Sequence, residues 1–469
     1  MENGLVCRRK RLKRFHNKTI VRQRTANAQF LDLPEDVLSS ILSKLPPKEI
    51  VRTSVLSSKW KHIWTLCSKL RFDGVTMCGG GSSGTKQYTQ KFVDAVGAFL
   101  KQYSGRLVEE LEVKFEFNGT LAEHLDGWVS LALSSRAKNL VFDLVPADWW
   151  GLSPARYRFP FEVFDGESIS RLQHMQLSFV SFKLPPKFSG FPNLKKLDLH
   201  VLHVSQKDLQ DLLSNCFNLE WLSIVRCHLN DELKVVHPLP RLLCLHVAHC
   251  NITKIEFNAM NLQTFAYSGP WLPIQLGHGL KLTDARLYFI EIISLECALP
   301  ALSNLLPRVQ NLTLRTYLSF EVPWLLGNRS KFSQLRYLQL RIFVPSECYD
   351  NIPSLGSFLS ASPFLEKLEI HFTVIALSHC SELTKRLPRC THNYLKNLYI
   401  TGFAGCAGQV ELLVHIVENA PNLEVLAIDR VNYFGDDEDC VKRPRIKALD
   451  IAKRHLDGKI SQNTQFFIQ

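Results

Sequence analysis

The sequence predicts an α/β protein in which a small N-terminal helical unit precedes a long curved solenoid built on one parallel sheet. Two patterns carry this prediction: apolar residues at helical spacing over residues 31–66, and a strand-like apolar pattern that recurs from residue 107 onward. The 469 residues, 46% of them hydrophobic and 21% charged, allow two to four domains or one repeat array. That composition excludes a mostly disordered chain and a collagen-like chain.

Most of the net charge of +12 lies in the first 28 residues, which hold nine Lys and Arg residues against Glu2 alone. The basic isoelectric point therefore belongs mainly to a tail, and we expect no direct nucleic-acid partner. Its charge and few apolar residues predict disorder. A basic cluster there is a candidate nuclear import signal, and the alternative is a solvated tail without a targeting role. The cluster comprises Arg8, Arg9, Lys10, Arg11, Lys13 and Arg14.

Residues 31–66 predict three short helices. Pro34 suits a first helical turn, where a missing N–H costs nothing. The first helix has apolar residues at helical spacing, namely Val37, Leu38, Ile41, Leu42 and Leu45, and Pro46-Pro47 ends it. A second helix carries Ile50, Val51 and Val55, and a third carries Trp60, Ile63 and Trp64. About forty residues form only a small core, so some of these apolar residues are expected to face a partner.

Several elements of this unit resemble the F-box in order and spacing: Leu33-Pro34, Ile41-Leu42, Leu45-Pro46, Val55-Leu56-Ser57 and Trp60. The resemblance implies a three-helix element that docks on the Skp-type adaptor of a cullin–RING ubiquitin ligase. Carried over residue by residue, it implies adaptor-binding positions at Leu33, Pro34, Val37, Leu38, Ile41, Leu42 and Trp60. The alternative, that such residues only hold the helices together, is favoured for Val51 and Val55.

Residues 74–86 are rich in Gly and Ser and predict a flexible loop. Gly79 and Gly84 have the interval of a phosphate-binding loop, but that motif requires Lys followed by Ser or Thr, whereas Thr85-Lys86 has the reverse order. A helix is expected over residues 90–103, with one apolar stripe. The stripe consists of Phe92, Val93, Val96, Phe99 and Leu100.

From residue 107 onward, an apolar residue is followed by a second three positions later and a third two positions after that. Leu194, Leu197 and Leu199 show the pattern most clearly. Ten starts between Leu194 and Leu423 are about 25 residues apart, which is the period of a leucine-rich repeat. Weaker copies start at Val108, Ala137 and Leu172, and Asn often precedes the first leucine, as at Asn193, Asn218 and Asn422. Because one unit cannot cover its own apolar face, the units are expected to stack into a horseshoe.

Alternation along each strand predicts which side chains face the concave surface. Aromatic and Arg side chains there favour protein recognition. The predicted target-binding residues are Lys196, Trp221, His246, Arg286, Tyr288, Arg315, Tyr337, Arg341 and Tyr399, and Lys367, Glu369 and His371 face the same way. The alternative is that many of these are tolerated polar residues. Small residues beside Trp221, such as Cys244 and Thr264, leave open a shallow ligand pocket.

After the repeats, residues 436–439 form an acidic run that lacks the glycine and terminal glutamate of a calcium loop. Residues 445–456 predict a helix that caps the last repeat, and residues 452–460 resemble the C-terminal tail of plant F-box/leucine-rich-repeat proteins of the FBD-like group. The expected division is a basic tail (1–28), an F-box (29–73), a Gly/Ser loop and connecting helix (74–106), leucine-rich repeats (107–434), and an acidic loop with a capping helix (435–469).

Little in the sequence favours catalysis. His246 and His249 lie near Cys250 and Cys227, but the repeat pattern points these side chains apart, which argues against a zinc site. The 13 cysteines include no Cys-x-x-Cys pair, and no secretory signal or membrane span is evident, so reduced thiols in the nucleus or cytoplasm are expected. We expect no enzyme activity, no cofactor, no metal and no membrane partner.

The resemblance implies the substrate-recognition subunit of an SCF-type E3 ubiquitin ligase. Its expected partners are a Skp-type adaptor, through it the cullin and RING subunits, and an unknown protein target held by the repeats. The alternative is a non-catalytic nuclear interaction scaffold that uses the F-box without promoting degradation.

Overall fold

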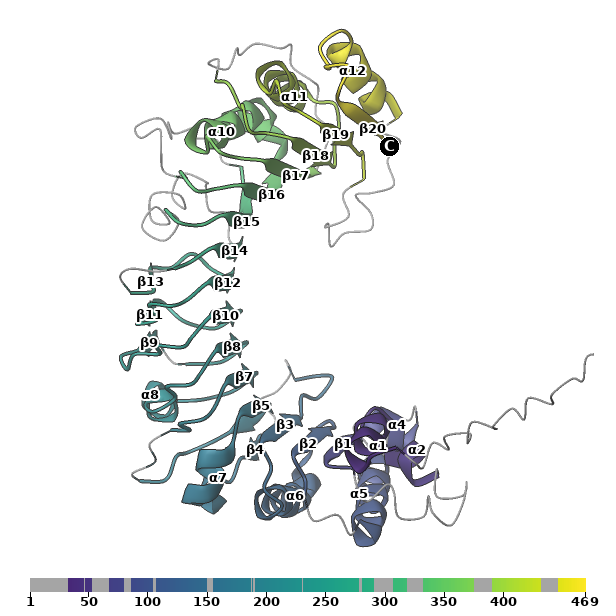
Figure 1. The fold of residues 1–469 in the computed structure, drawn as a ribbon, viewed down its shortest axis with the longest axis vertical. Coiled ribbons are helices and arrows are strands. Elements are labelled where there is room, and N and C mark those ends of the chain that lie inside the picture. The colour runs from purple at the N-terminus through teal and green to yellow at the C-terminus, as the bar shows by residue number, and fades with distance from the viewer. Residues whose placement is uncertain are drawn as a thin grey trace, which may run out of the picture.

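A computed structural model gives the fold, which is an open arc with the N-terminal helices at one tip and the C-terminal helices at the other (Figure 1). It describes residues 33–45, 47–52, 67–79, 86–103, 107–149, 155–186, 188, 190–229, 231–277, 281–290, 307–318, 332–374, 390–431 and 446–469. The predicted class, a helical unit followed by a leucine-rich-repeat solenoid, is confirmed.

One parallel sheet of fifteen described strands runs along the inside of the arc. The strands are β1 (Lys69–Asp73), β2 (Glu110–Lys114), β3 (Asn139–Asp143), β5 (His174–Ser178), β7 (Lys196–His200), β8 (Trp221–Val225), β10 (Cys244–Ala248), β12 (Thr264–Gly269), β14 (Asp284–Phe289), β15 (Asn311–Tyr317), β16 (Tyr337–Val344), β17 (Lys367–Val374), β18 (Asn397–Thr401), β19 (Val425–Ile428) and β20 (Gln465–Ile468). Every predicted repeat, including the three weaker copies, supplies one of these strands.

The repeat leucines share a register across the sheet. Leu197 pairs with Leu222, Leu222 with Leu245, and Leu245 with Phe265. Their side chains are fully buried, and the row continues without interruption from Leu70 to Leu426. Since each strand buries its apolar face only against the next turn, stacking supplies most of the stability of the solenoid.

Two strands of the fifteen-stranded sheet, one at each end, were not predicted from the sequence. Strand β1 lies within the range assigned to the F-box and pairs with β2 through Leu70 and Leu111. Strand β20 follows helix α12 (Ile446–Leu456) and pairs with β19. The expected C-terminal helix is present as α12 and packs against helix α11 (Ala407–Asn419), but the last strand of the sheet is β20, which was not predicted.

The outer side of the arc changes character along its length (Figure 1). Helices cover both ends: α4 (Gly74–Cys78), α5 (Lys86–Gln102), α6 (Ala122–Ser134), α7 (Gly166–Arg171), α8 (Gln206–Leu213), α10 (Gly356–Ala361), α11 and α12. In between, a three-stranded sheet replaces them, made of β9 (Leu233–Val235), β11 (Ile255–Phe257) and β13 (Ile274–Gln275). Short connections of this kind suit the repeats of about 20 residues in this part of the chain. Strand β4 (Tyr157–Arg158) pairs with β6 (Val180–Ser181) in a two-stranded ladder. The remaining described elements are the N-terminal helices α1 (Glu35–Leu42) and α2 (Pro47–Arg52) and the 3₁₀ helices η4 (Gly119–Leu121), η5 (Phe161–Val163) and η7 (Ser346–Leu355).

The segment after β1 is helical where a loop was predicted. Asp73 caps helix α4, because its carboxylate accepts a hydrogen bond from the Thr76 backbone N–H at 2.8 Å. Helix α5 begins at Lys86, four residues before the predicted start. Residues 80–85, which hold most of the Gly/Ser run, lie outside the described residues.

The asparagine that precedes the first leucine of many repeats links neighbouring turns. The Asn193 side-chain amide donates to the Ser170 carbonyl at 2.7 Å, and Asn218 donates to the Pro192 carbonyl at 2.8 Å. Asn422 repeats the contact one turn from the end of the chain. These bonds satisfy backbone carbonyls that the parallel ladder leaves free.

Two helical glycines give a test of packing at the C-terminal end. A Cβ on Gly408, in α11, would collide with the Tyr349 carbonyl oxygen, whereas a Cβ on Gly127, in α6, would meet no atom within 4 Å. We expect Gly408→Ala to destabilise the fold by about 2–3 kcal/mol, because backbone must shift. Gly127→Ala is expected to stabilise it by about 0.5–1 kcal/mol. Thermal unfolding followed by circular dichroism checks both, and equal melting temperatures for the two variants would contradict the described packing.

Candidate functional site

Helix α1 (Glu35–Leu42) has apolar side chains on two sides. Leu38 and Leu42 are buried, with 4% and 1% of their surface exposed. A second set of apolar residues is exposed at successive four-residue intervals: Val37 and Ile41 lie on the helix, and Leu33 and Leu45 lie just before and just after it, each between 36% and 38% exposed. Four large exposed apolar residues in one short segment form the kind of patch that marks a protein interface. We call these four residues the α1 stripe.

The predicted adaptor-binding set is thus divided by the fold. Leu33, Val37 and Ile41 belong to the α1 stripe, and Pro34 beside them is exposed. Leu38 and Leu42 pack inward instead. Trp60 and the predicted third helix lie outside the described residues, as does the basic cluster of residues 8–14. Leu45, which was not predicted as an adaptor-binding residue, completes the stripe, and its four-residue spacing from Ile41 is the sequence signal that could have included it.

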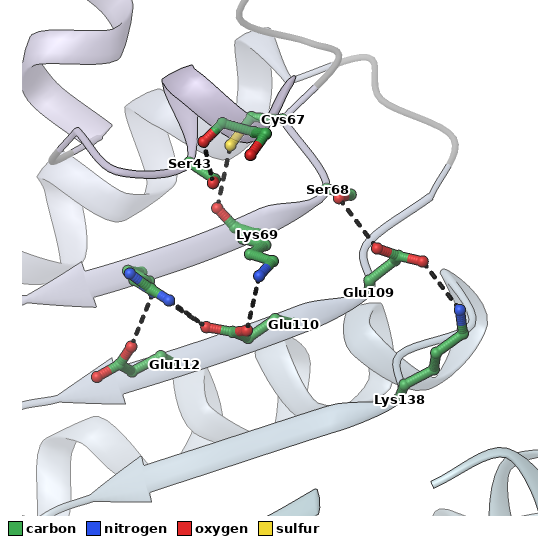
Figure 2. Close-up of polar contacts among 10 residues, drawn as sticks. Ser43, Cys67, Ser68, Lys69, Glu109, Glu110, Glu112 and Lys138 are labelled. Carbon is green, nitrogen blue, oxygen red and sulfur yellow. Dashed lines mark hydrogen bonds and ion pairs between the residues drawn. The ribbon is translucent and has the colours of Figure 1, made fainter. Parts of the chain in front are cut away.

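Helix α2 (Pro47–Arg52) joins this region to the solenoid through contacts with β1 and α4. Ion pairs then join β1 to the next strand, as Figure 2 shows. Arg71 lies 2.8 Å from a Glu110 oxygen and 3.1 Å from a Glu112 oxygen, and Lys69 lies 3.8 Å from Glu110. Because Lys69 and Arg71 are nearly half exposed, each pair contributes little stability. The register of β1 on β2 is set instead by the buried residues Leu70 and Phe72, which pair with Leu111 and Val113.

All nine predicted target-binding residues lie on the strands of the concave face, outside the buried row. Trp221 and Arg286 are exposed, and the other seven are half-buried. Six of the nine take part in two clusters of cations, carboxylates and aromatic rings. His246 lies 3.3 Å from the Ser223 hydroxyl, and Arg286 and Arg315 belong to neither cluster.

The first cluster centres on Asp198. The Trp221 indole N–H donates to one Asp198 oxygen at 2.9 Å, and the Lys196 ammonium lies 3.1 Å from the other. Lys196 also lies 5.5 Å from the centre of the Trp221 ring. Burial by itself would raise the pKa of Asp198, but contacts from His174, Trp221 and Lys196 outweigh it and lower the pKa. The carboxylate therefore fixes the orientation of the exposed indole.

The second cluster spans β14 and β16 to β18, with its centre at Lys367. Lys367 lies 5.2 Å and 5.1 Å from the ring centres of Tyr337 and Tyr399, so its ammonium sits between two aromatic side chains. The same ammonium is 2.8 Å from Glu369, which also accepts a hydrogen bond from the Gln339 amide at 2.8 Å. Arg341 lies 5.4 Å from the centre of the Tyr288 ring. We call Tyr337, Lys367, Glu369 and Tyr399 the aromatic cluster.

Glu369 is the carboxylate that holds the aromatic cluster together. Contacts with His371, then Lys367 and Gln339, outweigh its burial and hold its pKa well below the usual range. His371 is itself buried and lies 2.9 Å from the Thr401 hydroxyl. The alternation placed Lys367 and Glu369 on this face, but only the structure shows that they organise the tyrosines.

No group of three or more potential metal ligands occurs within the described ranges. His246 and Cys250 diverge as the repeat pattern implied, since Cys250 is buried and His246 is half-exposed on the concave face. None of the helices that the structure describes has both the length and the apolar character needed to cross a bilayer.

Comparison with known proteins gives two matches to family models. The LRR domain of At1g61320/AtMIF1 matches residues 99–464, and the F-box domain matches residues 30–72. Among relatives from Arabidopsis thaliana, the chain is 27% identical to F-box/FBD/LRR-repeat protein At3g14710, over 91% of this chain and 93% of that one. It is 25% identical to F-box/FBD/LRR-repeat protein At1g13570 over 56% and 63% of the two chains, and 29% identical to F-box protein At5g03100 over 42% and 57%. With several such relatives, the chain spans only about half to two thirds of their length.

Glu369 provides a test of the aromatic cluster. Glu369→Gln is expected to destabilise the fold by about 2 kcal/mol at pH 7, because it leaves Lys367 and His371 without their carboxylate. The folded-state pKa lies below the unfolded value of about 4.3, so this contribution is present above about pH 5 and lost as the pH falls below about 4. Denaturant unfolding at pH 7 and pH 3.5 measures it. Glu366→Gln, which breaks the exposed pair with Arg336, is the control and should cost under about 0.5 kcal/mol. Equal losses for both variants at pH 7 would contradict the role of Glu369.

Proposed function

Since the chain belongs to the plant F-box/leucine-rich-repeat family whose repeats are of the At1g61320/AtMIF1 type, we propose that it is the substrate-recognition subunit of an SCF-type E3 ubiquitin ligase. The F-box would bind a Skp-type adaptor, and through it the cullin and RING subunits. The concave face of the repeats would hold a target protein. The observation that carries the proposal is the α1 stripe, which exposes four large apolar residues in the segment that matches the F-box.

The α1 stripe fits an adaptor contact for a physical reason. Another side of α1 is already buried through Leu38 and Leu42, and Leu42 belongs to the chain's hydrophobic core, so packing within the described residues does not account for the exposed side. Burying four such residues against a partner removes apolar surface from water at about 25 cal/mol per Å². Leu38 and Leu42 then act indirectly, because they set the rotation of the helix that presents Val37 and Ile41.

The concave face suits a protein target. Its rings and cations are fixed before any partner arrives: Asp198 holds the Trp221 indole, and Glu369 holds Lys367 between Tyr337 and Tyr399. Preorganised aromatic side chains lose little entropy on binding. Lys196, His246, Arg286, Tyr288, Arg315 and Arg341 complete the proposed target surface.

In this proposal the protein catalyses no step. It binds two partners at separate places on one rigid arc, with the F-box segment at the N-terminal tip and the second cluster toward the other end (Figure 1). Holding a target on the same assembly as a charged conjugating enzyme raises its effective concentration. The curvature of the solenoid then decides which target lysines come within reach.

The adaptor contact is tested with the double variant Val37→Asp/Ile41→Asp. Two carboxylates on the α1 stripe should weaken adaptor binding about 30- to 1,000-fold, equivalent to about 2–4 kcal/mol. Titration of the purified full chain with a purified Skp-type adaptor gives the dissociation constants.

Val236→Asp/Met260→Asp is the matched control, since both residues are exposed apolar side chains far from α1. It should bind the adaptor like the unaltered chain. If the unaltered chain does not bind the adaptor, or if both double variants lose binding equally while remaining folded, the proposal is wrong. Adaptor binding without any effect on target turnover would point instead to a non-catalytic scaffold.

The target surface is tested with Tyr337→Ala/Tyr399→Ala. In plant cells treated with a proteasome inhibitor, some proteins should co-purify with the unaltered chain. Their recovery with this variant should fall at least tenfold, because each ring contributes about 1–2 kcal/mol to the binding free energy. Those proteins should also become longer-lived in cells that carry Val37→Asp/Ile41→Asp. Phe217→Ala/Met260→Ala, two exposed apolar residues outside the concave strands, is the control. Unchanged half-lives of every such protein would count against degradation.

A further inference from the structure

A second site lies on the rim of the arc, where the chain enters strands β3, β5, β7 and β8. A cavity of about 360 Å³ opens there, away from both the α1 stripe and the aromatic cluster. It is lined by Lys138, Ser170, Arg171, Gln173, Asn193, Lys195, Asn218 and Arg241. Four of these eight residues are cationic, and none is acidic. We call this cavity the rim pocket.

The repeat geometry brings the cations together. Lys138, Gln173 and Lys195 each immediately precede a strand, and the strands lie in the order β3, β5, β7. The Gln173 N–H donates to the Lys138 carbonyl, and the Lys195 N–H donates to the Gln173 carbonyl, both at 2.8 Å. Adjacent strands are about 4.8 Å apart, so Lys138 and Lys195 lie about 10 Å apart on either side of Gln173. Arg171 enters the space between them from the last turn of α7.

The positive charge of the rim pocket is only partly neutralised. Lys138 pairs with Glu109 at 2.9 Å, and one terminal nitrogen of Arg171, Nη2, pairs with Glu167 at 2.9 Å. The side chains of Lys195 and Arg241 form no ion pair or hydrogen bond with any residue that the structure describes. Cations therefore exceed their acidic partners by two. Glu220, which precedes β8, does not line the pocket.

Arg171 contributes a positive charge to the rim pocket but no open pair of donors. Its Nη2 atom pairs with Glu167, whereas its Nε and Nη1 atoms are buried and form no hydrogen bond with a described residue, although the side chain as a whole is 22% exposed. Nε and Nη1 direct their hydrogens to different sides of the guanidinium and are covered, so Arg171 acts on the rim pocket through its charge and not through a bidentate contact.

The neutral lining residues do not satisfy Arg171. The amide of Asn193 donates to the Ser170 carbonyl, the amide of Asn218 donates to the Pro192 carbonyl, and the Ser170 hydroxyl donates to the Glu167 carbonyl. These groups maintain the solenoid and hold the pocket open. The remaining accessible donors are the side chains of Lys195 and Arg241.

We propose that the rim pocket binds a phosphate monoester. A dianionic phosphate matches the excess of two positive charges, and its oxygens can accept from the exposed side chains of Lys195 and Arg241. The volume exceeds that of one phosphate group and lies at the lower end of small-ligand sites, which leaves room for the organic part. The monoester is either a free metabolite or a phosphorylated side chain of a bound protein. This proposal does not depend on the F-box function, since no residue of α1 contributes to the pocket.

The test measures binding by isothermal titration calorimetry at constant ionic strength, using the full chain. The ligands are inorganic phosphate, glucose 6-phosphate and a phosphoserine tetrapeptide. Chloride is the reference for inorganic phosphate, and the unphosphorylated sugar and tetrapeptide are the references for the other two. The variant Lys195→Ala/Arg241→Ala removes two exposed cations that have no partners. The control Lys207→Ala/Lys281→Ala removes the same charge from exposed lysines that do not line the pocket.

The unaltered chain and the control should bind a phosphorylated ligand at least tenfold more tightly than Lys195→Ala/Arg241→Ala does. Preference for glucose 6-phosphate would identify a free metabolite, and preference for the tetrapeptide a phosphorylated side chain. No binding of any phosphorylated ligand, or equal weakening by the pocket and control variants, would overturn the proposal.

Discussion

The shared register of the buried repeat residues is the constraint on which the rest of the structure depends. Leu197, Leu222 and Leu245 occupy the same place on successive strands, and each is covered mainly by its neighbours in the row. A shift of one residue in any strand would exchange buried leucines for Lys, Asp or Trp. The same register therefore determines both the curvature of the solenoid and the residues that it presents on its concave side.

The concave residues have a structural task besides binding. A parallel sheet is usually covered on both faces, yet this one is open along the inside of the arc. Long side chains cover it instead: the stems of Lys367 and Arg341 lie across neighbouring strands, with their charges beside Tyr337, Tyr399 and Tyr288. The side chains of such a surface are already ordered before a ligand binds, which is the property that a recognition surface needs. It also explains why six of the nine predicted residues belong to two clusters.

A feature of this structure could be predicted from the sequence when it depends on residues that are close together in the chain. The repeat strands and the exposure of Trp221 followed from alternation, because period-two burial can be read from a few residues. Strands β1 and β20 could not be identified, since Leu70 and Phe466 belong to segments too short to show a repeat and pair only with distant strands. The spacing of Val37, Ile41 and Leu45, with Leu38 and Leu42 beside them, identified the helix but not which of its apolar residues face water. The orphaned donors of Arg171 depend on side-chain packing between turns, and no sequence pattern reveals them.

The central claim is that one arc carries two separate binding faces, of which the α1 stripe belongs to the adaptor. Hydrogen–deuterium exchange of the full chain, with and without a saturating Skp-type adaptor, tests it most directly. The account predicts slower exchange in residues 33–45 and unchanged exchange in strands β7 to β18. Protection of the concave strands by the adaptor, with residues 33–45 unaffected, would contradict it.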